Sequence, residues 1–403
     1  MRRQAGRSIA VLGGGGAMGR IAVRDLTETA DSAIEILIAD RDLRAARQVA
    51  ADLSRPVRVL AADAGDPAAV ARRLAGTLVI VNACHHDFNL RVMDAALAIG
   101  SHYVDLGGLF HVTRRQLRRH AEFRNAGLLA LCGMGSAPGI VNVLARAGAD
   151  RLDQVDEIHV AVGTSVRTAR RDTFPLETSY SLQTVLDEAS LPAALFSGGM
   201  LQFVPPMSHA EAVDFPDPIG RRYPVCTLHS ELATLPLSFR RQGVREVSFR
   251  IAFPGDLADR LRFVHALGLT STTSIVVGGS KIVPRDLLLA MLSRKARPAD
   301  PGPPDEYEVL RVTLRGRRAG RIVEDVLDCH VPGMPAWGIG VDVDTGAPPS
   351  IAAQMIVAGS ITARGVVPPE RAVPPEPFFR ELTRRGMSIR RRTRRVGTRR
   401  STR

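Results

Sequence analysis

The first 135 residues alternate between short apolar runs and segments with a helical pattern. The apolar runs predict strands at residues 9–12, 34–39, 57–61, 78–82, 103–106 and 128–131. The segments between them predict helices near 20–29, 44–53, 67–74, 89–99 and 112–126. Strands that alternate with helices in this way are typical of a doubly wound parallel sheet. We therefore expect a Rossmann-type α/β domain over residues 1–135.

After Gly133 the regular succession of apolar strands and helices gives way to strands in which apolar and polar residues alternate. Residues 155–162 and 244–252 alternate apolar and polar side chains, as half-buried strands do. A third alternating run, 307–314, is followed by a short turn and a return run at 321–327, which predicts a hairpin. Residues 136–335 are thus expected to form an α+β domain around a mixed or antiparallel sheet.

A glycine cluster lies between the first predicted strand and the first predicted helix. Gly14, Gly16 and Gly19 have the spacing G-x-G-x-x-G, and Asp40 ends the next strand 21 residues after Gly19. Such glycines allow a tight turn, the approach of a pyrophosphate and close packing of helix on strand. The helix N-terminus adds backbone N–H groups and a positive dipole end. The segment predicts a dinucleotide site.

The composition argues against a membrane-spanning, secreted, disulfide-stabilised or zinc-binding protein. No run approaches the roughly 18 apolar residues that a membrane span requires, and the N-terminus lacks the pattern of a signal peptide. The four cysteines are scattered and form no C-x-x-C pair, which argues against a disulfide scaffold and a zinc site. We expect a cytoplasmic protein that does not bind membranes.

The net charge of +13 comes mostly from the C-terminal end. Residues 384–403 contain ten arginines and no acid, so the rest of the chain carries about +3. Residues 390–403 are expected to be a disordered arginine-rich tail. Nucleic-acid binding is not expected except through this tail, which leaves open a non-catalytic dinucleotide-binding protein that engages nucleic acid.

Several motifs follow one another along the chain. They are residues 78–108 (LVIVNACHHDFNLRVMDAALAIGSHYVDLGG), 131–142 (LCGMGSAPGIVN), 180–188 (YSLQTVLDE), 213–220 (VDFPDPIG), 229–236 (HSELATLP) and 344–387 (DTGAPPSIAAQMIVAGSITARGVVPPE, ending in EPFFRELTRRGM). In this order they resemble the saccharopine dehydrogenase family, and more closely its bacterial branch, which includes lysine 6-dehydrogenases.

The resemblance implies a Rossmann domain with a substrate domain inserted late in the chain, which would also form a homodimer. Residues 336–389 would then pack back on the first domain. It also implies hydride transfer between a nicotinamide and a C–N bond, with oxidative deamination of lysine as the first hypothesis. A reductase of the saccharopine or carboxynorspermidine type is the alternative. Saccharopine reductases carry an arginine where this chain has Leu228-His229, which disfavours saccharopine itself as substrate.

Oxidation of an amine requires a base, and one ionisable group near the nicotinamide serves both directions of the reaction. Asp105, at the end of a predicted strand, is the first candidate, although it suits equally a cap of the following glycine turn. Tyr103 is either a donor to the substrate or a packing residue. His229 suits proton exchange, carboxylate binding or a structural role.

The remaining site predictions concern binding. The turn before the helix at 140 is expected to bind substrate through Gly135, Ser136, Gly139 and Asn142. The dinucleotide is expected to contact Gly14, Gly16, Ala17, Met18, Gly19, Asp40, Arg41, Asp63, Asn82 and Ala83. Asp40 favours NAD because it repels a 2′-phosphate, and Arg41 leaves NADP possible. His85 and His86 have no Cys or Glu partner at ligand spacing, so no metal is expected.

Overall fold

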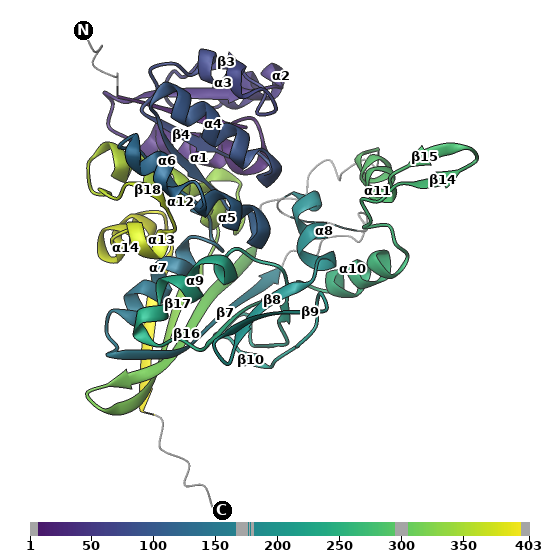
Figure 1. Ribbon diagram of the computed structural model, residues 1–403. Coiled ribbons are helices and arrows are strands. Elements are labelled where there is room, and N and C mark those ends of the chain that lie inside the picture. Colours follow the sequence, from purple (N-terminus) through teal and green to yellow (C-terminus); the bar gives the residue numbers. More distant parts are fainter. Residues whose placement is uncertain (1–6, 167–175, 177, 179–180, 295–304, 396–403) are drawn as a thin grey trace, which may run out of the picture.

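The computed structural model describes residues 7–166, 176, 178, 181–294 and 305–395. Two large β-sheets lie one above the other (Figure 1). Tyr180 of the family-like motif, and residues 396–403 of the predicted tail, lie outside the described residues.

The first sheet has seven parallel strands in the order β18-β6-β5-β4-β1-β2-β3. Its strands are β1 (Ser8–Leu12), β2 (Glu35–Asp40), β3 (Arg58–Ala61), β4 (Val79–Asn82), β5 (His102–Asp105), β6 (Leu129–Leu131) and β18 (Gly365–Val367). The direction of winding reverses between β4 and β1. Ligands bind beyond the carboxyl ends of the strands at such a point.

Helices cover both faces of this sheet. They are α1 (Ala17–Thr29), α2 (Leu43–Ala51), α3 (Pro67–Arg73), η1 (His86–Phe88), α4 (Asn89–Ile99), α5 (Leu109–Leu117) and α6 (His120–Asn125), whereas α7 (Ile140–Ala149) packs on β16, β17 and β7 of the second sheet. Asp42 and Asp66 accept hydrogen bonds from the first turns of α2 and α3, and left-handed Gly100 ends α4. Among the described residues, no helix is long and apolar enough to cross a membrane.

The second sheet is mixed, with the order β19-β17-β16-β7-β13-β8-β9 and with β12 beside β13. Its strands are β7 (Gln154–Val166), β8 (Ala193–Ser197), β9 (Met200–Val204), β12 (Val225–Cys226), β13 (Glu246–Ala252), β16 (Glu306–Arg318), β17 (Arg321–Val331) and β19 (Ser388–Arg395). Only β13 and β7 pair in parallel. The predicted fold class, a doubly wound parallel sheet with a mixed second sheet, is confirmed.

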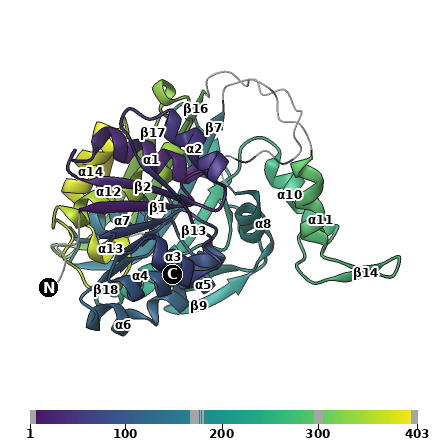
Figure 2. The same ribbon diagram turned by 90° about the horizontal axis from the view of Figure 1, so that it is seen from above.

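Smaller elements surround the second sheet. They are α8 (Leu182–Ser190), α9 (Glu231–Ser238), η2 (Arg240–Gln242) and the short strands β10 (Val213–Asp214) and β11 (Arg221–Arg222), whereas η3 (Pro335–Trp337) contacts α1 through Trp337. An arm projects from α8 and extends away from both sheets in two views (Figures 1 and 2). It consists of α10 (Leu257–Ala266), the hairpin β14 (Ile275–Val277) and β15 (Ser280–Ile282), and α11 (Pro284–Ser293).

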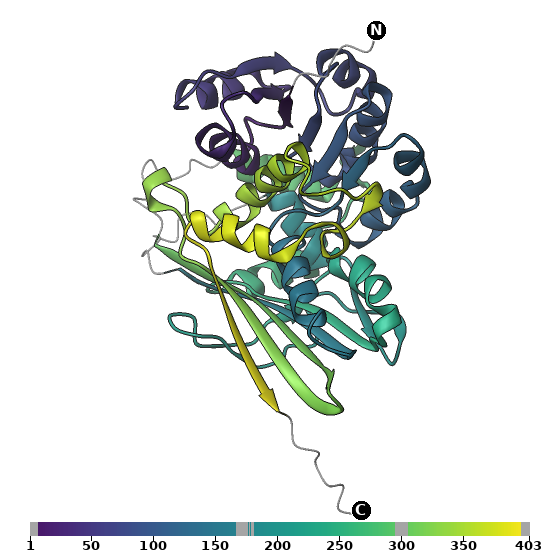
Figure 3. The same ribbon diagram turned by 90° about the vertical axis from the view of Figure 1, so that its left-hand side faces the viewer.

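After β17 the chain returns to the first sheet through α12 (Val343–Val357), β18, α13 (Pro369–Ala372) and α14 (Pro375–Arg384). Figure 3 shows α12 and α14 between the two sheets. Gly346 of α12 is close-packed on Ile21 of α1. The buried Asp25 carboxylate accepts hydrogen bonds from Arg385 Nε at 2.6 Å and Nη2 at 2.8 Å. A charge pair this deeply buried ties the end of the chain to α1.

The prediction of a disordered tail from residue 390 is wrong for residues 390–395. They belong to β19, which pairs with β17 beside the hairpin of β16 and β17 (Figure 3). Arg394 Nε lies 2.7 Å from Glu324 Oε1, and Arg391 pairs with Asp325. Composition alone missed these acidic partners on β17, which neutralise the arginines and allow the segment to extend the sheet.

Candidate functional site

The glycine loop connects β1 to α1. A Cβ on Gly19 would lie 2.1 Å from the carbonyl oxygen of Gly13, so only glycine fits at this position. The exposed Gly16 precedes α1, and in the described part of the chain this helix has no side-chain cap. The N–H groups of its first turn therefore have no partner within the helix. The loop fits a dinucleotide pyrophosphate, which such groups bind.

Asp40 at the end of β2 is held by two backbone donors. Its Oδ2 accepts a hydrogen bond from Gly15 N at 2.9 Å, and its Oδ1 accepts one from Asp42 N at 2.9 Å. Beside this strand end, Arg41 and Asp63 line a pocket together with Arg72 and Arg73. The carboxylate thus has a fixed place at the rim of the predicted dinucleotide site, with arginines next to it.

A cavity of about 250 Å³ lies between the carboxyl edge of the first sheet and the second sheet. Its first-sheet lining is Met18, Ala83, Cys84, His85, His86, Leu106, Gly107, Leu109, Ser136, Ala137 and Pro138. The rest of its lining is Val162, Ser181, Thr184, Glu188, His229, Ser230, Phe249, Ile251, Glu308, Val341, Asp342, Asp344 and Thr345. Among the described residues, four acids and no arginine or lysine line it, which suits a ligand that carries amino groups.

Glu308 and Asp344 form a carboxyl pair in this lining. Glu308 is on β16 and accepts a hydrogen bond from Thr164, while Asp344 is in the first turn of α12 and is 2% exposed. Burial, with the neighbouring Glu308 carboxylate, raises the pKa of Asp344 well above its usual value, and burial also raises the pKa of Glu308. Two neighbouring buried carboxyls disfavour ionisation of both groups at the same time.

His229 lies between two acids. Its Nδ1 is 2.8 Å from Glu231 Oε2, its Nε2 is 3.6 Å from Glu188 Oε1, and its ring stacks on Phe249 at 3.7 Å. Burial disfavours the charged ring, but Glu231 and Glu188 outweigh this effect and raise the pKa of His229 to about 10. His229 is therefore a cation at neutral pH, and its two ring nitrogens are engaged by Glu231 and Glu188.

Replacement of His229 by glutamine is expected to destabilise the protein by roughly 3–5 kcal/mol at pH 7, because it removes the cation of a buried ion pair. The folded pKa of about 10 is above the unfolded value of about 6.5. The stabilisation is therefore complete below about pH 6.5 and is lost as the pH rises through about 10.

Thermal unfolding of the wild type and His229→Gln between pH 6 and pH 10.5 measures this effect. The gap between the two should narrow as the pH rises, while His111→Gln, at an exposed histidine, should follow the wild type throughout. A gap that does not change with pH would contradict a charged His229.

Asp105 and Tyr103 do not line the cavity. The Asp105 carboxylate accepts hydrogen bonds from Gln116, the Tyr103 hydroxyl, Gly107 N and Gly133 N, at 2.6, 2.9, 3.0 and 2.7 Å. Tyr103 is fully buried, and its hydroxyl also accepts a hydrogen bond from Asn82. Of the alternatives that the sequence left open, the geometry favours the structural ones, in which these residues shape the turn after β5.

The turn before α7 brings Ser136 to the cavity, where its Oγ lies 3.0 Å from Thr345 Oγ1. Gly139 has a φ of +133°, and a Cβ there would lie 2.0 Å from Gly135 O. Asn142 is fully buried, accepts a hydrogen bond from Gly139 N and donates one to Glu370 Oε2 at 2.8 Å. We therefore assign Asn142 to the support of this turn and not to contact with substrate.

Among the predicted dinucleotide contacts after β4, Ala83 lines the cavity, but Asn82 does not. Asn82 is buried, and its amide donates to Asn89 at 2.9 Å and accepts from Cys84 N. Its side chain is thus occupied in holding the loop that follows β4, so we assign it a structural role.

Glu188 and Glu308 line the cavity but were not among the predicted site residues. Glu308 shares a strand face with Leu310 and Val312, which are fully buried, and an acid in the apolar register of a strand signals a functional site. Glu188 ends the motif at residues 180–188, but its place in the cavity depends on the packing of α8 beside the second sheet.

Two family models match the chain. The Saccharopine dehydrogenase NADP binding domain matches residues 9–131, and the Saccharopine dehydrogenase C-terminal domain matches residues 135–387. These ranges cover the glycine loop, the cavity lining and the return of the chain to the first sheet.

The chain is also similar to individual proteins, in sequence to one and in fold to two others. The carboxyaminopropylagmatine dehydrogenase of Synechocystis sp. is 24% identical over 365 residues, which are 88% of this chain and 90% of that protein. The fold is similar to that of saccharopine dehydrogenase (L-Glu forming) from Saccharomyces cerevisiae, with a TM-score of 0.72, 17% identity and coverage of 96% and 100% of the two chains. It is also similar to that of homospermidine synthase from Legionella pneumophila in complex with NAD, with a TM-score of 0.65, 13% identity and coverage of 98% and 93%.

Proposed function

This chain belongs to the saccharopine dehydrogenase family of NAD(P)-binding oxidoreductases, and we propose that it exchanges a hydride between the dinucleotide and a C–N bond of a cationic amino acid. The observation that carries this proposal is the charge of the cavity. Glu188, Glu308, Asp342 and Asp344 line it, together with one histidine that is charged at neutral pH. A ligand with more ammonium than carboxylate groups complements this lining.

The cavity has two charged clusters with different roles: one is Glu308 with Asp344, and the other is His229 with Glu188. The Glu308–Asp344 pair binds the ammonium group next to the reacting carbon and accepts its proton when the amine is oxidised. At the other cluster, Glu188, held beside the charged His229, contacts a second cationic group of the substrate. Because charges in a buried cavity are weakly screened, both contacts orient the substrate strongly.

The bound dinucleotide would supply the hydride chemistry, and the protein would supply its orientation. The glycine loop, with Gly14, Gly16, Ala17, Met18 and Gly19, would hold the pyrophosphate. Met18 and Ala83 line the cavity and would hold the nicotinamide end against the substrate.

Two reactions fit this charge pattern. Oxidative deamination of a terminal amine, as in lysine 6-dehydrogenase, needs one amino acid and NAD. Reduction of an imine between an amine and a carbonyl compound gives a secondary amine. The full-length likeness to a carboxyaminopropylagmatine dehydrogenase favours the second reaction as an alternative.

The absorbance of the reduced dinucleotide distinguishes oxidative deamination from secondary-amine formation. The purified protein is incubated with NAD and lysine or ornithine, and separately with NADH, a diamine or agmatine, and a carboxylate-bearing aldehyde. Formation of NADH in the first mixture supports deamination, and consumption of NADH in the second supports secondary-amine formation. No change in either mixture would overturn the proposal.

The fixed Asp40 carboxylate is expected to make NADH bind at least ~10-fold more tightly than NADPH, because it lies where a 2′-phosphate would bind. Asp40→Asn keeps an acceptor for Gly15 N but removes the charge, and Arg41 then remains as a partner for a phosphate. This variant should lose most of the preference. Fluorescence titration of both cofactors measures it, and tighter binding of NADPH to the wild type would contradict the assignment.

The homodimer stays a prediction. Ile275, Val276 and Val277 on the arm are more than half exposed, and an isolated two-stranded hairpin is marginally stable in water. The arm is therefore the surface that we expect a second copy of this chain to cover. Light scattering of the purified protein measures the mass.

A further inference from the structure

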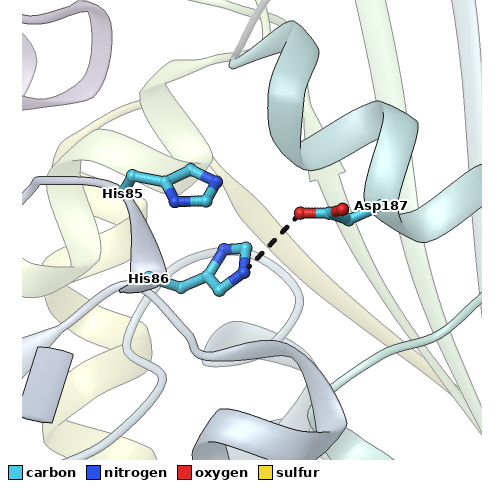
Figure 4. Close-up of side chains that lie close together, drawn as sticks. All are labelled: His85, His86 and Asp187. Atoms are coloured by element: carbon cyan, nitrogen blue, oxygen red, sulfur yellow. Dashed lines mark ion pairs between the residues drawn. The ribbon is translucent and has the colours of Figure 1, made fainter. Parts of the chain in front are cut away.

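Three potential metal ligands meet at the rim of the cavity. His85 and His86 follow β4, and Asp187 is on α8, about one hundred residues later (Figure 4). One ligand atom from each of the three lies within 4.8 Å of the others, and His86 Nε2 is 3.7 Å from Asp187 Oδ2. The fold thus supplies the third ligand that spacing in the sequence did not reveal.

His85 has a buried nitrogen without a partner. Its Nε2 makes no hydrogen bond with any described residue, while its Nδ1 lies 3.3 Å from Asp87 Oδ2 and accepts a long hydrogen bond from Asp87 N at 3.5 Å. Metal-bound histidines commonly have a carboxylate behind the second ring nitrogen, because it fixes the tautomer and leaves the other nitrogen free to ligate. Asp87 is placed to act in this way on His85.

Asp187 is oriented by an arginine. Its Oδ1 accepts a hydrogen bond from Arg285, and its Oδ2 faces His86. Asp87 and Glu188 lie close enough to His86 to act on it electrostatically. These acids offset the positive charge of Arg285 and favour a cation at the centre of the cluster.

We propose that His85, His86 and Asp187 bind one divalent transition-metal ion of the zinc class. Two imidazoles and one carboxylate are ligands that Zn²⁺, Co²⁺ and Ni²⁺ accept, and a water completes a tetrahedral site. Tetrahedral bonds of about 2.1 Å place ligand atoms roughly 3.4 Å apart, so rotation of the side chains closes the set. The ion would link the loop after β4 to α8 across the mouth of the cavity.

Calorimetric titration of tag-free protein, stripped with a chelator, tests the proposal with Zn²⁺ and Co²⁺ alone. We expect one ion per chain, visible absorption bands of tetrahedral Co²⁺, and a higher thermal unfolding temperature with Zn²⁺. His86→Ala should weaken Zn²⁺ binding at least ~100-fold, because it removes a ligand. Asp87→Asn should weaken it about 10-fold, since outer partners have effects of this size.

The exposed His111 provides the matched control, because His111→Ala removes a histidine outside the cluster. This variant should bind Zn²⁺ as the wild type does. If Asp187→Asn does not fold because Arg285 loses its partner, the histidine variants still decide the question. Equal Zn²⁺ binding by the wild type and His85→Ala/His86→Ala would overturn the proposal. NADH titration of the same samples shows separately whether the dinucleotide site is intact.

Discussion

Substitution of Gly19 by alanine is expected to abolish dinucleotide binding and to lower the thermal unfolding temperature by more than ~10 °C, because the clash falls on backbone. The new methyl group would lie 2.1 Å from Gly13 O and 2.8 Å from Gly14 Cα. No side-chain rotation relieves such contacts, so the loop has to separate from α1.

Gly16→Ala is the matched variant. Its Cβ would meet only Gly13 O, at 3.2 Å, and the backbone at Gly16 has a φ of −79°, which any residue adopts. We expect this variant to unfold close to the wild-type temperature while binding NADH about 10- to 100-fold more weakly, because the methyl group occupies the approach of the pyrophosphate.

Thermal unfolding and NADH titration of the two variants separate folding from binding. Loss of affinity in Gly16→Ala without loss of stability locates the pyrophosphate at this loop. Wild-type affinity in Gly16→Ala would show that the dinucleotide binds elsewhere.

The second large effect is expected at the carboxyl pair. Glu308→Gln and Asp344→Asn should each lower kcat at least ~100-fold, because each removes the acceptor for the substrate proton. Glu157→Gln is the control, since Glu157 is on β7 outside the cavity lining and pairs with His159. Catalysis at wild-type rate by both variants would exclude the pair from the reaction.

Asp344→Asn is expected to lower kcat but to raise the stability of the folded protein at neutral pH. The folded protein holds Asp344 protonated more tightly than the unfolded chain does, because burial and Glu308 raise its pKa. Its contribution to stability is thus complete below the unfolded pKa of about 4 and is lost as the pH rises through the folded value. At neutral pH, Asp344→Asn should raise the unfolding temperature of the ligand-free protein by ~2–4 °C.

The higher unfolding temperature of Asp344→Asn would show how much the buried carboxylate destabilises the ligand-free wild type. The difference between wild type and Asp344→Asn should grow as the pH rises above about 4, because the unfolded chain then releases the Asp344 proton while the folded protein retains it. A scan of unfolding temperature against pH measures it. An Asp344→Asn variant that is less stable than the wild type at every pH would show that the carboxyl group has a structural role.

Patterns along the chain predicted the first sheet well, since its strands are apolar and are separated by helices. They also located the glycine loop and Asp40, because a dinucleotide site of this kind is built from one continuous segment. β18 was not predicted as a strand of this sheet, since it enters from residue 365 after the whole second sheet. Its place depends on contacts far apart in the sequence.

The cavity was harder to predict than the fold. Asp105 follows a strand as a catalytic acid would, but four donors around it favour a structural role. His85 and His86 lacked a third ligand in their own segment, and Asp187 reaches them only through the packing of α8. The side chains of this site come from both sheets, so their proximity depends on how the sheets pack together.

The arginine-rich segment also shows that local sequence does not reveal contacts with distant residues. Local composition predicted disorder for residues 390–395, yet Glu324 and Asp325 on β17 provide partners for its charges. Propensity and net charge describe a segment alone, and tertiary contacts override them.

The most direct test follows the hydride itself. Lysine is deuterated at the carbon that bears its terminal amine, a carboxyalkyl polyamine is deuterated next to its secondary amine, and each is incubated with the protein and NAD. We predict that the reduced dinucleotide carries deuterium at the nicotinamide ring with one of these substrates, as mass spectrometry would show. Reduced dinucleotide without the label, or none with either substrate, would contradict the account.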